Sequence, residues 1–103
     1  MYKVTILPVA KQDIKEAAEW YNLRQGGLGK RFTNQVREKV NLVKQNPYSS
    51  ANRYEEVRTA VLDVFPFMIH YLIDASHKLV IITAVLHTSR NPDLWKADRE
   101  GAF

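Results

Sequence analysis

The sequence predicts an α+β fold, with two helices packed on one face of a single, mostly antiparallel sheet. Three observations support this prediction. A short apolar run opens the chain, two segments with helical periodicity follow, and the remainder consists of strand-like runs separated by turn residues. Strands grouped after a pair of helices are typical of α+β proteins. The expected order of elements is β-α-α-β-β-β.

The bulk composition is that of one globular domain spanning residues 1–103, with 46% hydrophobic and 25% charged residues. A chain of this length can bury a real core without covalent cross-links. The absence of cysteine excludes disulfides and thiolate metal sites. The longest near-apolar run, 79–86, is too short to cross a membrane, and the first residues do not form a secretory signal. We therefore expect a cytoplasmic protein without membrane association.

The net charge of +4 favours an acidic partner, either nucleic acid or an acidic protein segment. A charge of this size on a small domain could also serve only to keep it soluble.

The first strand is expected at Tyr2–Leu7, where apolar side chains occupy alternate positions. Pro8 ends it because proline cannot donate a hydrogen bond to a neighbouring strand. From Ala10 the period changes to that of a helix, which the glycines within residues 25–29 terminate. The apolar stripe of this helix consists of Ile14, Ala17, Ala18 and Tyr21.

A second amphipathic helix is expected at Leu28–Gln45, ended by Asn46-Pro47. Because the loop between the two helices is short, they should pack as an antiparallel hairpin. The apolar stripe consists of Leu28, Phe32, Val36, Val40 and Val43. The outer side is basic and carries Lys30, Arg31, Arg37, Lys39 and Lys44.

The rest of the chain is expected to form strands joined by turns. Pro47–Arg53 is interpreted as a polar connection, Pro92–Trp95 as one helical turn, and the tail beyond Lys96 as frayed. The three strands are expected at Glu55–Leu62, Phe67–Ile73 and Lys78–His87, with turns at 63–66 and 74–77.

The candidate functional residues are polar side chains on otherwise apolar strands: Arg58, His70 and His87, with Arg90 just beyond the last strand. If the first three point away from the helices, they line the open face of the sheet. Such a cluster could cleave RNA, with an imidazole of pKa ~6.5 as base and an arginine to stabilise phosphate. It could also bind an acidic protein segment, or be an ordinary solvated surface. Trp95 is either a cap over the core or an exposed contact residue.

Several loose motifs occur together in a specific order. They are Ala10–Ile14, Trp20-Tyr21, Asn46-Pro47, Val57-Arg58, Phe67–Tyr71 and Val85–Pro92. Over nearly the whole chain this pattern resembles the RelE/ParE superfamily of toxins from bacterial type II toxin–antitoxin modules. The Val-Leu-His-Thr-Ser-Arg-Asn-Pro ending is most similar to the ParE-type, plasmid-stabilisation branch.

This resemblance implies a compact toxin that a cognate antitoxin neutralises in a hetero-oligomeric complex. ParE-type members inhibit DNA gyrase, whereas RelE-type members cut mRNA on the ribosome with the help of an arginine on the strand matching Phe67–Tyr71. In this sequence Met68 stands where that arginine would align, and the C-terminal tyrosine of RelE-type members has no clear match. The resemblance therefore favours the ParE-type activity.

The expected function is thus inhibition of gyrase by binding, without catalysis, cofactor or metal. In this interpretation Arg58, His87, Arg90 and Trp95 contact the target. The alternative is a ribosome-dependent mRNA endoribonuclease that uses His70 or His87 as base and Arg58 or Arg90 for phosphate. A second alternative is an inactive superfamily member that serves as a binding module.

Overall fold

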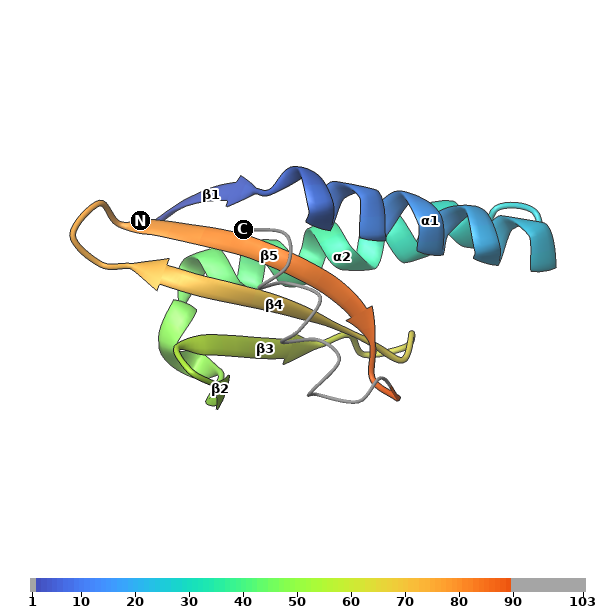
Figure 1. Cartoon of the computed structure of the whole chain (residues 1–103). Helices are drawn as coiled ribbons and strands as arrows, with labels where there is room; N and C mark the ends of the chain where they lie inside the picture. Colours follow the sequence, from blue (N-terminus) through green and yellow to red (C-terminus); the bar gives the residue numbers. More distant parts are fainter. Residues whose placement is uncertain (1, 90–103) are drawn as a thin grey trace.

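The structure is a computed structural model that describes residues 2–89 (Figure 1). Both helices lie on one face of a single open sheet, which confirms the predicted α+β fold. The strand order across the sheet is β1-β5-β4-β3-β2, with β1 parallel to β5 and the other neighbours antiparallel. The elements are β1 (Lys3–Ile6), α1 (Pro8–Arg24), α2 (Leu28–Gln45), the 3-10 helix η1 (Pro47–Ser49), β2 (Asn52–Tyr54), β3 (Val57–Val61), β4 (Phe67–Asp74) and β5 (Leu79–His87).

The 3-10 helix η1 and strand β2 are elements that the sequence did not predict. The segment Pro47–Arg53, expected to be a polar connection, contains η1 and most of β2. This strand has only three residues, two of them exposed, and its pairing with β3 is irregular, so it carries no alternating pattern. The helical turn expected at Pro92–Trp95 and the tail beyond Lys96 lie outside the described residues.

Helix α1 begins at Pro8, two positions before the predicted start at Ala10. Proline suits the first position of a helix because its φ angle is already helical and its missing N–H would have had no partner. The predicted apolar stripe faces the sheet: Ala17 and Tyr21 are buried, and Ile14 packs against the same core. Neither helix within residues 2–89 is both long and apolar enough to cross a membrane.

The turn between the helices is held by one side chain. The Asn22 side-chain oxygen accepts hydrogen bonds from the backbone N–H groups of Gly27, at 3.1 Å, and Gly29, at 3.0 Å. Gly27 has a φ of 87°, a left-handed conformation that glycine adopts without strain. At Gly29 the helices approach so closely that an added Cβ would lie 2.3 Å from the carbonyl oxygen of Ala18.

An aromatic cluster joins the helices to the sheet. Tyr21 of α1 and Phe32 of α2 meet Phe65, from the β3–β4 turn, and Phe67 of β4. The ring centroids are 4.8 Å apart for Tyr21–Phe65 and 5.1 Å apart for Phe32–Phe67. Burial in this cluster raises the pKa of the Tyr21 hydroxyl. The residues 63–66 do form a turn, as predicted, but Phe65 turns inward and becomes part of the core.

A β-bulge interrupts the pairing of β4 with β5. His70 lies opposite Ala84 and Tyr71 opposite Ile82, so Thr83 has no residue opposite it. The regular alternation of faces is broken at this point. Ile82 before the bulge and Val85 after it both pack in the main core. On the other face a smaller cluster forms from Met68, Ala84 and Leu86, with Tyr54 packed against it.

We expect Gly29→Ala to destabilise the protein by about 1–3 kcal/mol, because the new methyl group cannot fit against the Ala18 carbonyl without moving one helix. Urea unfolding followed by circular dichroism measures the change. Gly26→Ala is the matched control, since no atom lies within 4 Å of its would-be Cβ. Equal stability of the two variants would contradict the close helix contact.

Candidate functional site

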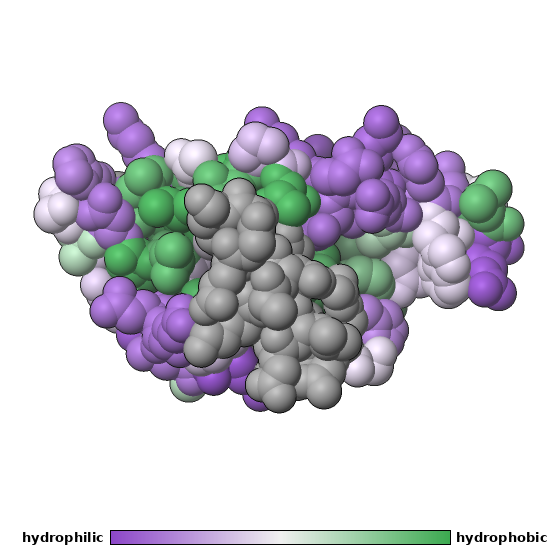
Figure 2. Space-filling view, in the orientation of Figure 1, coloured by the Kyte–Doolittle hydropathy of each residue, from purple (hydrophilic) through white to green (hydrophobic). Residues whose placement is uncertain are grey.

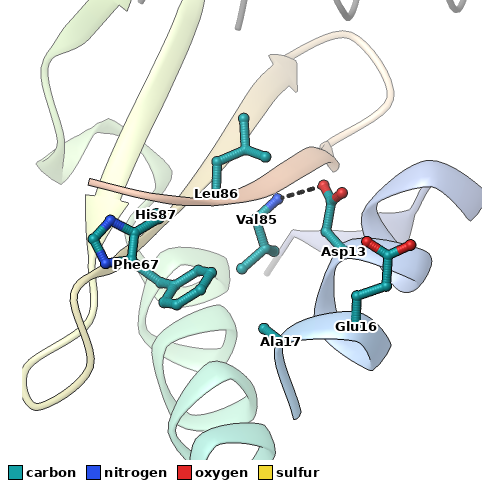
Figure 3. Close-up of a pocket in the computed structure, with 7 residues that line it drawn as sticks. All are labelled: Asp13, Glu16, Ala17, Phe67, Val85, Leu86 and His87. Atoms are coloured by element: carbon teal, nitrogen blue, oxygen red, sulfur yellow. Dashed lines mark hydrogen bonds between the residues drawn. The ribbon is translucent and has the colours of Figure 1, made fainter. Parts of the chain in front are cut away.

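His87 lies at the end of β5 on the face that the helices cover. Its partner in the β4–β5 register is Phe67, and the two rings contact edge to face with centroids 5.3 Å apart (Figure 3). Residues directly opposite each other in antiparallel strands share a face of the sheet. Because Phe67 packs against the main core, His87 belongs to the helix side and not to the open face.

A pocket of about 260 Å³ opens beside His87. In Figure 3 its walls come from α1 on one side and from β4 and β5 on the other. The Asp13 carboxylate accepts a hydrogen bond from the backbone N–H of Val85 at 3.0 Å. Strand β1 pairs with β5 only as far as Ile82. Beyond that point the Asp13 carboxylate accepts the backbone hydrogen bond of Val85 that a neighbouring strand would otherwise accept. The lining residues are Asp13, Glu16, Ala17, Phe67, Val85, Leu86 and His87.

The hydrogen bonds of His87 determine which ring nitrogen carries the proton when the imidazole is neutral. Its Nδ1 accepts a hydrogen bond from the backbone N–H of Ser89 at 3.1 Å, and the Ser89 hydroxyl lies 2.7 Å from the same nitrogen. A nitrogen that accepts a backbone N–H carries no proton, so the proton of the neutral imidazole is on Nε2. In this form the Nε2 of His87 is a hydrogen-bond donor.

His70 lies on the opposite face of the sheet and is fully buried. Its Nδ1 is 3.1 Å from the hydroxyl of Tyr54. Its carbonyl oxygen accepts a hydrogen bond from the Thr83 hydroxyl at 3.3 Å, beside the bulge. Thr59 lies opposite it on β3 and receives a long hydrogen bond from Arg53. His70 is therefore a packed part of this face rather than an exposed group.

Arg58 fastens the 3-10 helix to the sheet. Arg58 lies opposite Tyr71 of β4, and Tyr71 packs in the main core. Arg58 is therefore on the face of the sheet that the helices cover. Its guanidinium donates a hydrogen bond to the carbonyl of Ser50 and lies 5.1 Å from the centre of the Tyr48 ring. The Tyr71 hydroxyl donates to the carbonyl of Pro47 at 2.7 Å. Both ends of η1 are thus tied to the sheet.

The three described candidates do not form the common open surface that the sequence suggested. Arg58 and His87 share the helix side, but their partners on β4 are Tyr71 and Phe67, four positions apart or roughly 13 Å along the strand. His70 is on the other face. The bulge at Thr83 explains the error for His87, because it reverses which residues of β5 face the helices. Arg90 and Trp95 lie outside the described residues.

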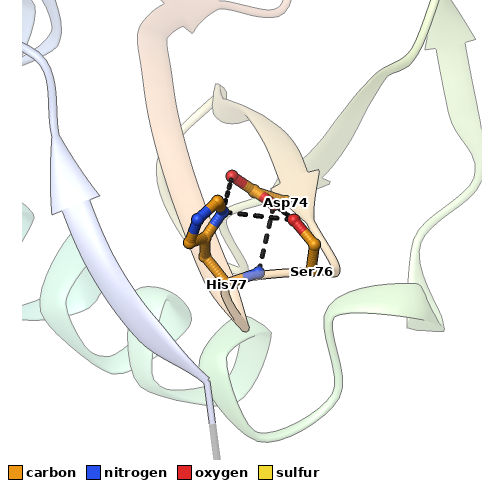
Figure 4. A network of polar contacts seen from close by, with 3 residues as sticks. All are labelled: Asp74, Ser76 and His77. Carbon is orange, nitrogen blue, oxygen red and sulfur yellow. Dashed lines mark hydrogen bonds and ion pairs between the residues drawn. The ribbon is translucent and has the colours of Figure 1, made fainter.

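A second polar cluster occupies the turn between β4 and β5 (Figure 4). The His77 Nδ1 lies 2.9 Å from one Asp74 oxygen, and the Ser76 hydroxyl donates to the other at 2.8 Å. The hydroxyl proton of Ser76 therefore goes to the carboxylate and not to the imidazole. A nucleophilic serine needs a base that accepts its proton, so this cluster stabilises the turn and does not form a catalytic triad.

Sequence reasoning missed the residues that hold these candidates in place. Asp13 entered the sequence analysis only as part of the motif Ala10–Ile14 and was given no role. Tyr48 lies in the segment interpreted as a connection, and Tyr54 lies directly after it. Their partners are far away in the sequence, so no local pattern points to them. Within residues 2–89 no group of three His, Asp or Glu side chains is placed to hold a metal ion.

A family comparison and a structural comparison give consistent results. The sequence model of the ParE toxin of type II toxin–antitoxin systems, parDE, matches residues 4–92. Among curated proteins, none is significantly similar in sequence to this chain.

Solved structures of toxins share the fold. The chromosomal ParDE system from P. aeruginosa superposes with a TM-score of 0.75 at 19% identity, covering 86% of this chain and 98% of that one. The intact E. coli RelBE complex gives a TM-score of 0.68 at 15% identity, covering 87% and 100%. The isolated E. coli RelE toxin gives 0.65 at 16% identity, covering 97% and 98%. At such low identities these likenesses show the fold alone.

We expect Arg58→Ala to lower the free energy of unfolding by about 1–2 kcal/mol, because it removes both the Ser50 hydrogen bond and the stacking on Tyr48. Urea unfolding measures the loss. Arg37→Ala is the control, since that arginine is exposed and its hydrogen bond to Asn34 is long, at 3.4 Å. Equal effects of the two substitutions would contradict the structural role of Arg58.

The pKa of the Asp74 carboxyl lies below its usual value, first because of the Ser76 hydrogen bond and then because of His77. A depressed pKa in the folded state adds stability above the unfolded-state pKa, and this stability is lost as the pH falls through the folded-state pKa. We expect Ser76→Ala to raise the Asp74 pKa, measured by NMR titration of the carboxyl carbon. Ser49→Ala, in η1, should leave it unchanged; an unchanged Asp74 pKa in Ser76→Ala would refute the assigned cause.

Proposed function

This chain belongs to the family of ParE toxins of type II toxin–antitoxin systems, and we propose that it halts replication by binding DNA gyrase. In this proposal a cognate antitoxin keeps the toxin inactive in the bacterial cytoplasm, in a complex of the two proteins. No cofactor takes part. The solved relatives include a ParDE system and a RelBE complex, which supports an antitoxin partner.

The observation that carries the proposal is the separation of the acid–base candidates. RNA cleavage needs a base and a phosphate-binding group on the same substrate atoms. Arg58 and His87 lie at different ends of the helix side, and His70 is buried on the other face. His87 also presents a donor, which suits contact with an acceptor on a partner protein. These features favour binding over catalysis.

The proposed contact surface lies around the end of β5. His87 is partly exposed there, and its ring is held by Phe67 and Ser89. A side chain with a fixed orientation loses little entropy when a partner binds. We include Arg58, Arg90 and Trp95 in the proposed contacts, as the sequence suggested. Arg58 is the member that also has a structural task, so its loss affects folding as well.

The alternative is a ribosome-dependent mRNA endoribonuclease, and the partial exposure of His87 is the observation that favours it. Of the two candidate histidines, it is the one that a substrate can reach without rearrangement of the sheet. In this alternative His87 acts on the nucleotide and Arg90 binds phosphate. The protein could also be a family member that has lost its activity and acts as a binding module.

We expect purified protein to inhibit supercoiling of relaxed plasmid by gyrase. The variant His87→Ala should need about tenfold more protein for the same inhibition, because a contact residue with a fixed orientation is lost. His77→Ala is the matched control, since that histidine is exposed at the opposite end of β5. Supercoiling that continues at large molar excess of toxin would refute the gyrase proposal.

Pulse-labelling after induced expression without antitoxin separates the alternatives. An early fall in thymidine incorporation indicates replication as the target. An early fall in methionine incorporation indicates translation and supports the ribonuclease. Growth with neither effect identifies an inactive binding module.

A further inference from the structure

A row of exposed side chains follows α1 from the pocket beside His87 to the loop that joins the two helices. Glu16 lines that pocket (Figure 3), Trp20 follows four positions later, and Leu23 follows three positions after Trp20. All three side chains are exposed. Residues three and four apart are neighbours on one face of a helix. This row, the α1 stripe, therefore connects the pocket with the closed end of the helical hairpin.

Ring contacts also connect Trp20 with His87. Trp20 meets Tyr21 edge to face, with ring centroids 5.1 Å apart. The Tyr21 centroid lies 6.0 Å from that of Phe67, which in turn lies 5.3 Å from that of His87. Tyr21 and Phe67 pack in the main core, so they hold the two outer rings in place. A specific interface covers about 800 Å² on each partner, so one partner can contact Trp20 and His87 together.

Two large apolar side chains of the stripe are open to solvent. Trp20 is 51% exposed, and Leu23 is 88% exposed. The Arg24 guanidinium lies 4.4 Å from the centre of the Trp20 ring. This stacking and the contact with Tyr21 restrain the Trp20 side chain before any partner binds, so less entropy is lost on binding. Tryptophan and arginine are also enriched among the residues that carry most of the binding energy at protein interfaces.

The closed end of the hairpin is well fixed and projects beyond the sheet (Figure 1). The Asn22 side chain accepts hydrogen bonds from the N–H groups of Gly27 and Gly29, and the two helices touch at Gly29. Figure 2 shows a small hydrophobic area at this end of the molecule, between hydrophilic side chains. A projecting end of this kind can enter a recess in a partner.

The charges differ between the two ends of the stripe. Residues 20–31 contain no carboxylate and three exposed cations, Arg24, Lys30 and Arg31. Within residues 2–89 none of these three takes part in an ion pair. Nearer the pocket, Glu16 and Glu19 are exposed on α1. The hairpin end therefore attracts carboxylates of a partner, whereas the part of the stripe beside the pocket repels them.

This distribution of charge favours a protein over DNA as the partner. DNA carries phosphates along its whole length, so Glu16 and Glu19 would repel it, and its backbone offers no apolar pocket for Leu23. A second copy of the chain is also less suited. Stable homodimer interfaces are more hydrophobic than this stripe, in which Trp20 and Leu23 stand among charged side chains. Such a mixture is typical of a contact between two proteins that also exist apart.

We propose that the α1 stripe extends the target contact of His87 to the hairpin end, where Trp20 and Leu23 enter an apolar pocket of gyrase bordered by carboxylates. This assignment rests on the proposed function for the identity of the partner. The three cations of the hairpin end bind the bordering carboxylates. The apolar anchors provide most of the affinity, and the charged contacts set the orientation.

The first test measures inhibition of gyrase supercoiling by Leu23→Ala. Because Leu23 is 88% exposed, this substitution leaves the core intact. We expect the concentration for half-inhibition to rise about tenfold, since an apolar anchor is lost. Leu42→Ala is the matched control, because Leu42 is 55% exposed on α2 and lies outside the stripe. Lys30→Glu should also weaken inhibition, whereas Lys11→Glu, near the start of α1, should not.

Site-specific cross-linking identifies what the hairpin end touches. The chain contains no cysteine, so Gln25→Cys can carry a single benzophenone. It should cross-link to a gyrase subunit, whereas Ala75→Cys, exposed in the turn between β4 and β5, should not. Cross-links from Gln25→Cys to DNA, or to a second copy of the chain, in place of gyrase would overturn the inference.

The unsubstituted chain separates the failure of this inference from the failure of the proposed function. If that chain does not inhibit supercoiling, the gyrase function is refuted and the inference is refuted with it. If it inhibits and Leu23→Ala inhibits equally well, the function stands and only the extended contact is refuted.

Discussion

The packing of two helical aromatic residues against two aromatic residues of the sheet is the contact on which the rest of this structure depends. Tyr21 and Phe32 come from different helices, and Phe65 and Phe67 flank the start of β4. Aromatic pairs of this kind contribute about 0.5–1.5 kcal/mol each beyond the burial of their area. They fix both helices on one face of the sheet and leave the other face to a smaller cluster around Met68.

This arrangement explains why the two ends of β5 differ. Strand β1 accompanies β5 only over its first half, because the chain must turn at Leu7 and Pro8 to begin α1. Beyond Ile82 the edge of β5 is open, and the side chain of Asp13 replaces the missing strand. The same turn leaves β1 itself at the margin of the sheet. A short first strand thus leaves room for the pocket beside His87.

Most of the polar residues on the strands serve the structure. Arg58 ties η1 to β3, and His70 is buried beside Tyr54 and Thr83. Buried polar groups are retained where they are hydrogen-bonded, since an unpaired one is costly. His87 differs because it sits at the end of its strand and is partly exposed.

The sequence by itself determined the helices, the long strands and the faces of β1 and β4, because each depends on a local period of apolar residues. The stripe around Tyr21 and the alternation from Phe67 to Ile73 are visible without any structure. Only the tertiary structure decided the strand order, the existence of β2 and the side on which His87 lies. These depend on pairing between distant segments, and the unpaired Thr83 that reverses β5 leaves no mark in the sequence.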